Sequence, residues 1–69
     1  MTKQQIGNYI KECRIAQGWK KKPLCDKIGI SRTQLDMVEQ GRTNYTIDTF
    51  VKVCEALNID FEKLQHNER

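Results

Sequence analysis

The side chains best suited to specific chemistry in this chain lie on one short predicted helix, residues 31–40. Its polar face carries Arg32, Thr33, Asp36, Met37 and Gln40. The first turn of such a helix also presents unpaired backbone N–H groups and the positive end of the helix dipole, which suit a phosphate group. Generic helical hairpins share these features, so a DNA-reading surface and a plain solvated helix both remain open at this point.

Residues for other kinds of chemistry are sparse. The chain has three cysteines, Cys13, Cys25 and Cys54, and one histidine, His66. The sequence contains no CxxC or HxxxH pair, and each cysteine occupies an apolar position of a helical pattern. We therefore interpret the thiols as core residues rather than metal ligands. We expect no metal, no cofactor and no catalytic residue, because no nucleophile has a base beside it in the sequence.

Length and composition limit the class of protein. The 69 residues, 38% of them hydrophobic and 30% charged, indicate a single globular domain over residues 1–69. No apolar run approaches the roughly 18 residues of a membrane span, and the N-terminus lacks the apolar segment of a signal peptide. We therefore expect a cytoplasmic protein without membrane association, and not a large enzyme.

Charge is divided unevenly along the chain. Residues 1–45 contain nine basic and four acidic residues, whereas residues 46–69 contain three basic and five acidic ones, within a net charge of +3. This division suggests a surface that faces a polyanion and a separate opposite face. A solvated charged surface is the alternative interpretation.

Capping residues and hydrophobic spacing predict five short helices. Thr2 and Gln5 have the spacing of a capping box at the start of the first helix. Ser31 and Gln34 repeat that pattern at the third helix, which Gly41 ends. These signals are local, so they predict where the helices begin and end without reference to the rest of the fold.

The second predicted helix covers about residues 21–28 and is joined to the third by Gly29 and Ile30. A short turn containing glycine lets two helices meet at a steep angle, and the second of them can then project from the body of the protein. Because Lys22 precedes Pro23, it is pushed away from helical geometry. This favours a later start of the second helix.

The last two predicted helices lie in the C-terminal third. Thr46 caps the fourth helix, whose apolar stripe consists of Ile47, Phe50, Val51, Cys54 and Leu57. Asp60 can cap a short fifth helix carrying Phe61 and Leu64. No segment alternates with period two for long enough to predict a strand, so the expected fold class is all-α.

Ordered runs of residues resemble a known family. The chain is similar to the Cro and phage C-repressor helix-turn-helix family, also called lambda-repressor-like or XRE, through Arg14–Trp19, Leu24–Arg32, Val38–Arg42, Asn44, Thr49, Glu55–Leu57 and Leu64. The similarity covers nearly the whole chain from Ile6. It implies a compact five-helix DNA-binding domain in which the second and third helices form a helix-turn-helix motif over about residues 21–40.

The resemblance implies roles for individual residues of the third helix. In the family this helix enters the major groove, and the first residues after its N-cap touch base edges. The matching residues are Arg32, Thr33, Gln34 and, one turn later, Met37. Arginine suits guanine, glutamine suits adenine, and methionine offers apolar contact to a thymine methyl group. Asp36 either accepts from cytosine N4 or repels phosphate and lowers affinity. We favour a third interpretation, in which it is a solvated helix residue without a role in DNA binding.

The resemblance also implies phosphate contacts from the start of the second helix and from the loop after the third. The matching residues are Lys20, Lys21, Lys22, Arg42, Thr43 and Asn44. This chain has Lys20-Lys21 where the family usually has Ser-Gln, and Tyr45 where it usually has proline. The positive end of the helix dipole repels lysines at a helix N-terminus. Three lysines in a row are easier to explain if a bound phosphate offsets this electrostatic cost. A plain surface cluster is the alternative.

Two further positions are expected to support the fold. The family pairs the positions of Arg14 and Glu39 in a largely buried ion pair between the first and third helices, and we expect the same pair here. Trp19 is interpreted as a core residue at the corner between the first two helices. Arg14 is therefore expected to stabilise the fold rather than to contact DNA.

The leading hypothesis is a small transcriptional regulator of phage or bacterial origin, most simply a repressor, that binds double-stranded DNA. One recognition helix covers few base pairs, so specificity calls for a homodimer on an inverted repeat. Residues 58–64, with Ile59, Phe61 and Leu64, are the candidate dimer contact, although they can instead close the monomer's own core. The alternatives are an antitoxin or a restriction–modification controller of the same fold that acts with a protein partner.

Overall fold

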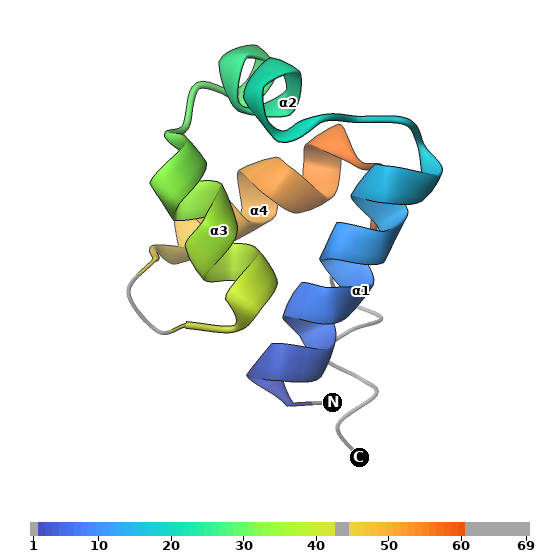
Figure 1. Cartoon of the computed structure of the whole chain (residues 1–69). Coiled ribbons are helices and arrows are strands. Elements are labelled where there is room, and N and C mark those ends of the chain that lie inside the picture. The colour runs from blue at the N-terminus through green and yellow to red at the C-terminus, as the bar shows by residue number, and fades with distance from the viewer. Residues whose placement is uncertain (1, 43–44, 61–69) are drawn as a thin grey trace.

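The computed structural model describes residues 2–42 and 45–60, and four α-helices contain most of them (Figure 1). These are α1 (Lys3–Ala16), α2 (Lys21–Ile28), α3 (Arg32–Gln40) and α4 (Ile47–Ala56). The described residues contain no strand, which confirms the all-α class. The expected fifth helix is not confirmed, because nearly all of it, including Phe61 and Leu64, lies outside the described residues. None of the described helices combines the length and the apolarity that crossing a membrane requires.

α1, α3 and α4 begin where the local capping signals predict. The Thr2 hydroxyl accepts from the Gln5 backbone N–H at 3.1 Å, and the Gln5 side-chain oxygen accepts from the Thr2 N–H at 2.8 Å. Thr46 caps α4 by accepting from the Thr49 N–H at 3.2 Å. Each cap pairs a backbone N–H that has no partner within its helix.

α2 begins at Lys21, with Lys20 as its N-cap, so the later start expected from Lys22 and Pro23 is wrong. Pro23 occupies the third helical position, where an N–H would have no partner inside the helix and its absence removes no hydrogen bond. The first intrahelical bond runs from the Leu24 N–H to the Lys20 carbonyl at 3.2 Å.

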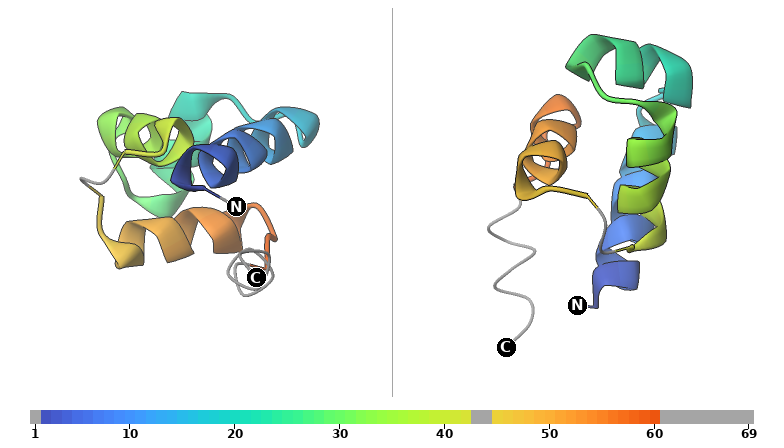
Figure 2. Two further views of the ribbon diagram at one scale, coloured as in Figure 1. Left: turned by 90° about the horizontal axis from the view of Figure 1, so that it is seen from below. Right: turned by 90° about the vertical axis from the view of Figure 1, so that its left-hand side faces the viewer.

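All four helices contribute to one apolar core. Figure 2 shows α1 and α3 on one side of the molecule, α4 on the other, and α2 across one end. The buried apolar residues between them are Ile10, Leu24, Cys25, Leu35, Val38, Phe50, Val53, Cys54 and Leu57. Trp19 packs against this core and is partly buried rather than enclosed.

The predicted apolar stripe of α4 is correct only in part. Phe50, Cys54 and Leu57 are buried, but Ile47 is 70% exposed, and Val53, which we did not place on the stripe, is fully buried. The buried positions recur at spacings of three and four along the helix, as one face of an α-helix requires. Ile47 is the first residue of α4, and it projects beyond the neighbouring helices.

Two of the three thiols are core residues, as predicted. Cys25 and Cys54 are buried, whereas Cys13 is half-buried, so the interpretation as core holds less well for Cys13. Burial raises the pKa of the Cys54 thiol from an ordinary 9.0 to about 11. At neutral pH this group is therefore a protonated, apolar residue on the buried face of α4, where it fills part of the core.

α1 and α3 approach each other closely at Gly7. A Cβ atom at this position would lie 2.5 Å from the Glu39 carbonyl oxygen and 2.6 Å from that of Val38. Both neighbours are backbone atoms, so no side-chain rotation could make room. The absence of a side chain at Gly7 therefore sets the separation of the two helices.

Replacing Gly7 by alanine is expected to lower the free energy of unfolding by about 2–3 kcal/mol, because the added methyl group must push α3 away from α1. Urea denaturation followed by circular dichroism measures this loss. Glu12→Ala, at an exposed site of the same helix, is the matched control and should change stability little. A Gly7→Ala variant as stable as the wild type would contradict the close approach.

Candidate nucleic-acid interface

α2 and α3 are joined by a three-residue turn, Gly29–Ser31, and lie at a steep angle to each other (Figure 1). Gly29 adopts the left-handed conformation at φ 77° and ψ 33°, and its N–H donates to the Cys25 carbonyl at 2.8 Å. Glycine tolerates this conformation because it has no Cβ atom. The turn thus ends α2 and redirects the chain into α3 within three residues.

A reciprocal capping box closes the N-terminus of α3. The Ser31 hydroxyl accepts from the Gln34 N–H at 3.1 Å, and the Gln34 side-chain oxygen accepts from the Ser31 N–H at 3.3 Å. Gln34, which we expected to read bases, thus uses its carbonyl oxygen within the protein. Its Nε2 group keeps its donors for another partner, while the capping bond restricts the orientation of the amide.

α3 presents the other expected base-reading residues on one accessible face. Arg32 and Thr33 are exposed and Met37 is half-buried, whereas the opposite face, with Leu35 and Val38, is buried against the core. Because α3 is held against the body on that face, its outward side chains project from a fixed support. Such a surface suits docking into a groove of DNA.

The expected phosphate-contacting residues at the start of α2 are largely paired with carboxylates. The Lys21 ammonium lies 2.8 Å from Asp36 Oδ1 on α3, and the Lys22 ammonium lies 3.8 Å from Asp26 Oδ2 on the same helix. Within the described part of the chain, Lys20 forms no ion pair. The lysines are therefore not equivalent in their electrostatic surroundings.

Asp36 is not the solvated bystander that we favoured. Its side chain and that of Lys21 are each only 35% exposed, and their ion pair connects the two helices of the motif. The two carboxylate–lysine contacts near the start of α2 thus differ, since Lys22 and Asp26 are 79% and 71% exposed and belong to one helix.

The second expected phosphate-contacting group lies after α3. Arg42 is exposed, and its Nε donates to the side-chain oxygen of Gln40 at 3.2 Å. Thr43 and Asn44 lie outside the described residues. Arg42 is therefore the one member of this group for which the structure gives a position.

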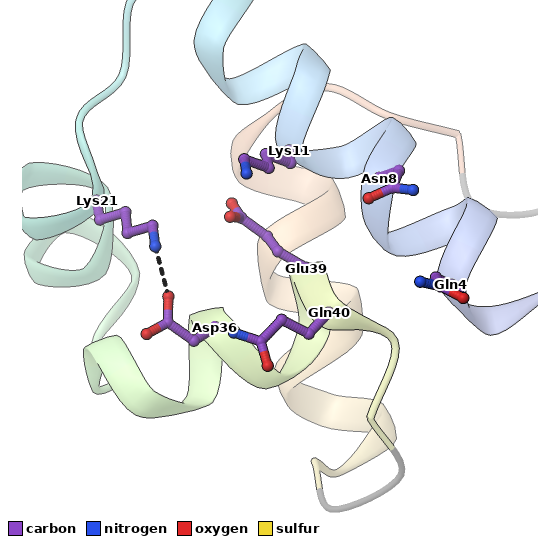
Figure 3. A pocket seen from close by; sticks show the side chains of 7 residues that line it. All are labelled: Gln4, Asn8, Lys11, Lys21, Asp36, Glu39 and Gln40. Carbon is purple, nitrogen blue, oxygen red and sulfur yellow. Dashed lines mark hydrogen bonds and ion pairs between the residues drawn. The ribbon is translucent and has the colours of Figure 1, made fainter.

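A polar surface pocket of about 200 Å³ lies beside the contact of α1 with the helix-turn-helix (Figure 3). It is lined by Gln4, Asn8, Lys11, Lys21, Asp36, Glu39 and Gln40. The α1 members were missed by the sequence analysis, although their spacing of four and three residues is the signal of one helical face. The Lys21–Asp36 pair forms part of the opposite wall.

A buried ion pair lies beneath this surface. Arg14 Nε donates to Glu39 Oε2 at 2.6 Å, Arg14 Nη2 donates to Glu39 Oε1 at 3.4 Å, and Arg14 Nη1 donates to the Trp19 carbonyl at 2.9 Å. The two side chains are only 7% and 4% exposed. One guanidinium thus links α1, the corner before α2, and α3.

Comparisons with known proteins identify similar chains. A family model described as Helix-turn-helix matches residues 10–64. The chain is 33% identical over 55 residues to the antitoxin HipB of Escherichia coli (strain K12), an alignment that covers 80% of this chain and 62% of HipB. The chain thus spans about three fifths of the length of that relative.

Solved structures are similar along most of the chain. A chain of the HipA-HipB-O2-O3 complex has a TM-score of 0.78 at 30% identity, and the match covers 87% of this chain and 84% of that one. The restriction-modification controller protein C.AhdI from Aeromonas hydrophila has a TM-score of 0.70 at 28% identity, with 83% of each chain covered.

Replacing Glu39 by alanine is expected to lower the free energy of unfolding by about 3–5 kcal/mol, because the buried Arg14 charge would lose its partner. In so small a protein this loss can unfold the chain. Thermal and urea denaturation measure it. Asp26→Ala, which breaks the exposed pair with Lys22, is the control and should have little effect. Wild-type melting of the Glu39 variant would refute the structural importance of the pair.

Proposed function

Because the chain belongs to the helix-turn-helix family, we propose that it is a sequence-specific regulator of transcription, and specifically a repressor, that reads the major groove of double-stranded DNA with α3. The observation that carries this proposal is the accessible face of α3, which a core, a capping box and a buried ion pair hold in one orientation. In this proposal residues 1–69 act as one domain, with the helix-turn-helix at about residues 21–40.

The proposed base contacts come from the first turns of α3. Arg32 is exposed and can bond bidentately to the O6 and N7 atoms of guanine, while Met37 can contact a thymine methyl group. Thr33 can bond to several bases. The capping bond of the Gln34 oxygen restricts the approach that bidentate pairing with adenine requires, so we assign it the weaker contribution of a single donor.

The proposed phosphate contacts fix the register of the protein on the duplex. They comprise Lys20, Lys21 and Lys22 before and within α2, and Arg42, Thr43 and Asn44 after α3. Lys20 and Arg42 are exposed and can reach a phosphate without first leaving a carboxylate. Lys22 has a distant, exposed partner in Asp26, whereas Lys21 has a shorter and less exposed contact with Asp36.

A homodimer on an inverted repeat would extend the site that is read, with half-sites about 34 Å apart. We propose residues 58–64 as its contact. Ile59 packs against the core, and its N–H donates to the Cys54 carbonyl at 2.8 Å, so this part of the segment also supports the monomer. Phe61 and Leu64 lie outside the described residues. A regulator of bacterial or phage genes would act in the cytoplasm.

The similarity to the antitoxin HipB favours a second candidate function. In this alternative the chain binds a toxin protein as well as DNA. The similarity to a restriction-modification controller favours a related one. Neighbouring genes distinguish the candidates: a toxin-like reading frame indicates an antitoxin, whereas methylase and nuclease genes indicate a controller.

The proposal is tested by selecting bound sites from a random pool of double-stranded DNA at moderate salt and sequencing them. We expect an inverted repeat with half-sites one helical turn apart. A pool without enrichment would contradict sequence-specific binding by the chain alone and would favour a function that requires a protein partner.

Replacing Arg32 by alanine is expected to weaken binding to the selected site by about 1–3 kcal/mol and to relax preference at one base-pair position, because a bidentate base contact is lost. Affinity for random DNA should change little. Binding titrations on both DNAs measure the two effects. Equal losses on the selected and random duplexes would show that Arg32 contacts phosphate instead.

A further inference from the structure

The outward face of α3 carries one carboxylate among its proposed base-reading residues. Asp36 lies one helical turn after Arg32 and one turn before Gln40, so it occupies the middle of this face. The other carboxylate of α3, that of Glu39, is buried in the pair with Arg14. A negative charge in the middle of a surface that meets a polyanion is costly unless it has a purpose or a partner.

The partner of Asp36 is Lys21 at the start of α2. The ammonium and Oδ1 lie 2.8 Å apart, and both side chains are 35% exposed (Figure 3). The two residues come from different helices of the motif and line the same polar surface pocket. Their contact is thus shorter and less exposed than that of Lys22 with Asp26 at 3.8 Å.

This geometry restricts where the Lys21 charge can be used. A lysine without a partner has a long flexible stem, and it can follow a phosphate in many relative positions of protein and DNA. An ammonium held by Asp36 stays at one place on the surface. It has three N–H donors, so those not bonded to Asp36 can still reach a phosphate that comes to that place.

We propose that Asp36 is a specificity-determining residue that positions Lys21, so that this lysine meets a phosphate only in the register set by the base contacts of α3. In other registers, and on unrelated sequences, the charges of Lys21 and Asp36 cancel, so the pair adds nothing to the electrostatic attraction between the protein and DNA. The pair therefore lowers affinity for random DNA more than affinity for the preferred site. This inference rests on the proposed DNA-binding function.

The test compares Asp36→Asn with the wild type on the selected site and on a random-sequence duplex. Freeing one lysine for phosphate is expected to raise affinity for random DNA about three- to tenfold at 100 mM salt and to steepen the salt dependence by about 0.9. Affinity for the selected site should change less than about twofold, so discrimination falls. In a Lys21→Gln background, the same substitution should change random-DNA affinity less than about twofold.

Asp26→Asn is the matched control, because it makes the same change in net charge beside a lysine that is already exposed. It should leave discrimination unchanged. Equal gains of Asp36→Asn on both DNAs, or equal gains with and without Lys21, would overturn the proposal, because the carboxylate would then only repel phosphate. A loss confined to sites with cytosine at one position would also overturn it, in favour of base reading by Asp36.

A second variant keeps the proposal testable if Asp36→Asn does not fold, which circular dichroism will show. Lys21→Gln should lose more affinity on the selected site than on random DNA, whereas Lys20→Gln, at an exposed lysine without an ion pair among the described residues, should lose equally on both. Equal losses for both lysines would overturn the proposal.

If the wild-type protein binds neither DNA, the proposed function fails and this inference fails with it. If the wild-type protein binds DNA but Asp36→Asn changes neither affinity, only the inference fails.

Discussion

The position of α3 depends on one buried interaction, the ion pair of Arg14 with Glu39. Two charges removed from water are costly, and only good geometry with further hydrogen bonds offsets that cost. Here both carboxylate oxygens accept from the guanidinium, and its remaining nitrogen donates to the Trp19 carbonyl. Apolar packing alone tolerates sliding between helices, whereas this set of bonds is satisfied in one arrangement of α1, the corner and α3. Gly7 adds the steric counterpart, since its close approach to the α3 backbone sets the distance at which those bonds can form.

Local signals in the sequence are sufficient to predict where α1, α3 and α4 begin, but not which residues of each helix are buried. The capping boxes that begin at Thr2 and Ser31 each involve two residues three positions apart, so the types of these residues are enough to predict the boxes. Which residues of α4 are buried depends on where α2 and α3 lie, and the exposed Ile47 and the buried Val53 show that a count of apolar spacings does not contain this information. Gly7 carried no signal at all, because a glycine within a helix gives no indication of what lies opposite.

The candidate site shows the same division. The exposure of Arg32 and Thr33 follows from the pattern of α3, and their roles stay predictions that come from family resemblance. The cap formed by Gln34 and the pair formed by Asp36 change what those side chains can do. Gln34 is assigned both to the cap and to base reading, and the bond that its carbonyl oxygen accepts from the Ser31 N–H restricts how its amide can approach a base. The partner of Asp36 is fifteen residues away in sequence, and no periodicity connects the two positions.

The pair of Lys21 with Asp36 also offsets an unfavourable concentration of positive charge at the start of α2. This helix has no side-chain cap at Lys20 and no acidic residue in its first turn, so its partial positive charge is met by three more positive charges. Asp36 on α3 pairs with the ammonium of Lys21, the first residue of α2, and so balances one of these positive charges. The charge that the α2 sequence lacks is thus supplied from α3 through the fold. A DNA phosphate at the same place would provide the same kind of charge, which supports the proposed phosphate contact of Lys21. The stability of α2 and the attraction of this surface for DNA therefore depend on one local balance of charge, which a substitution at Asp36 or Lys21 would alter in both respects.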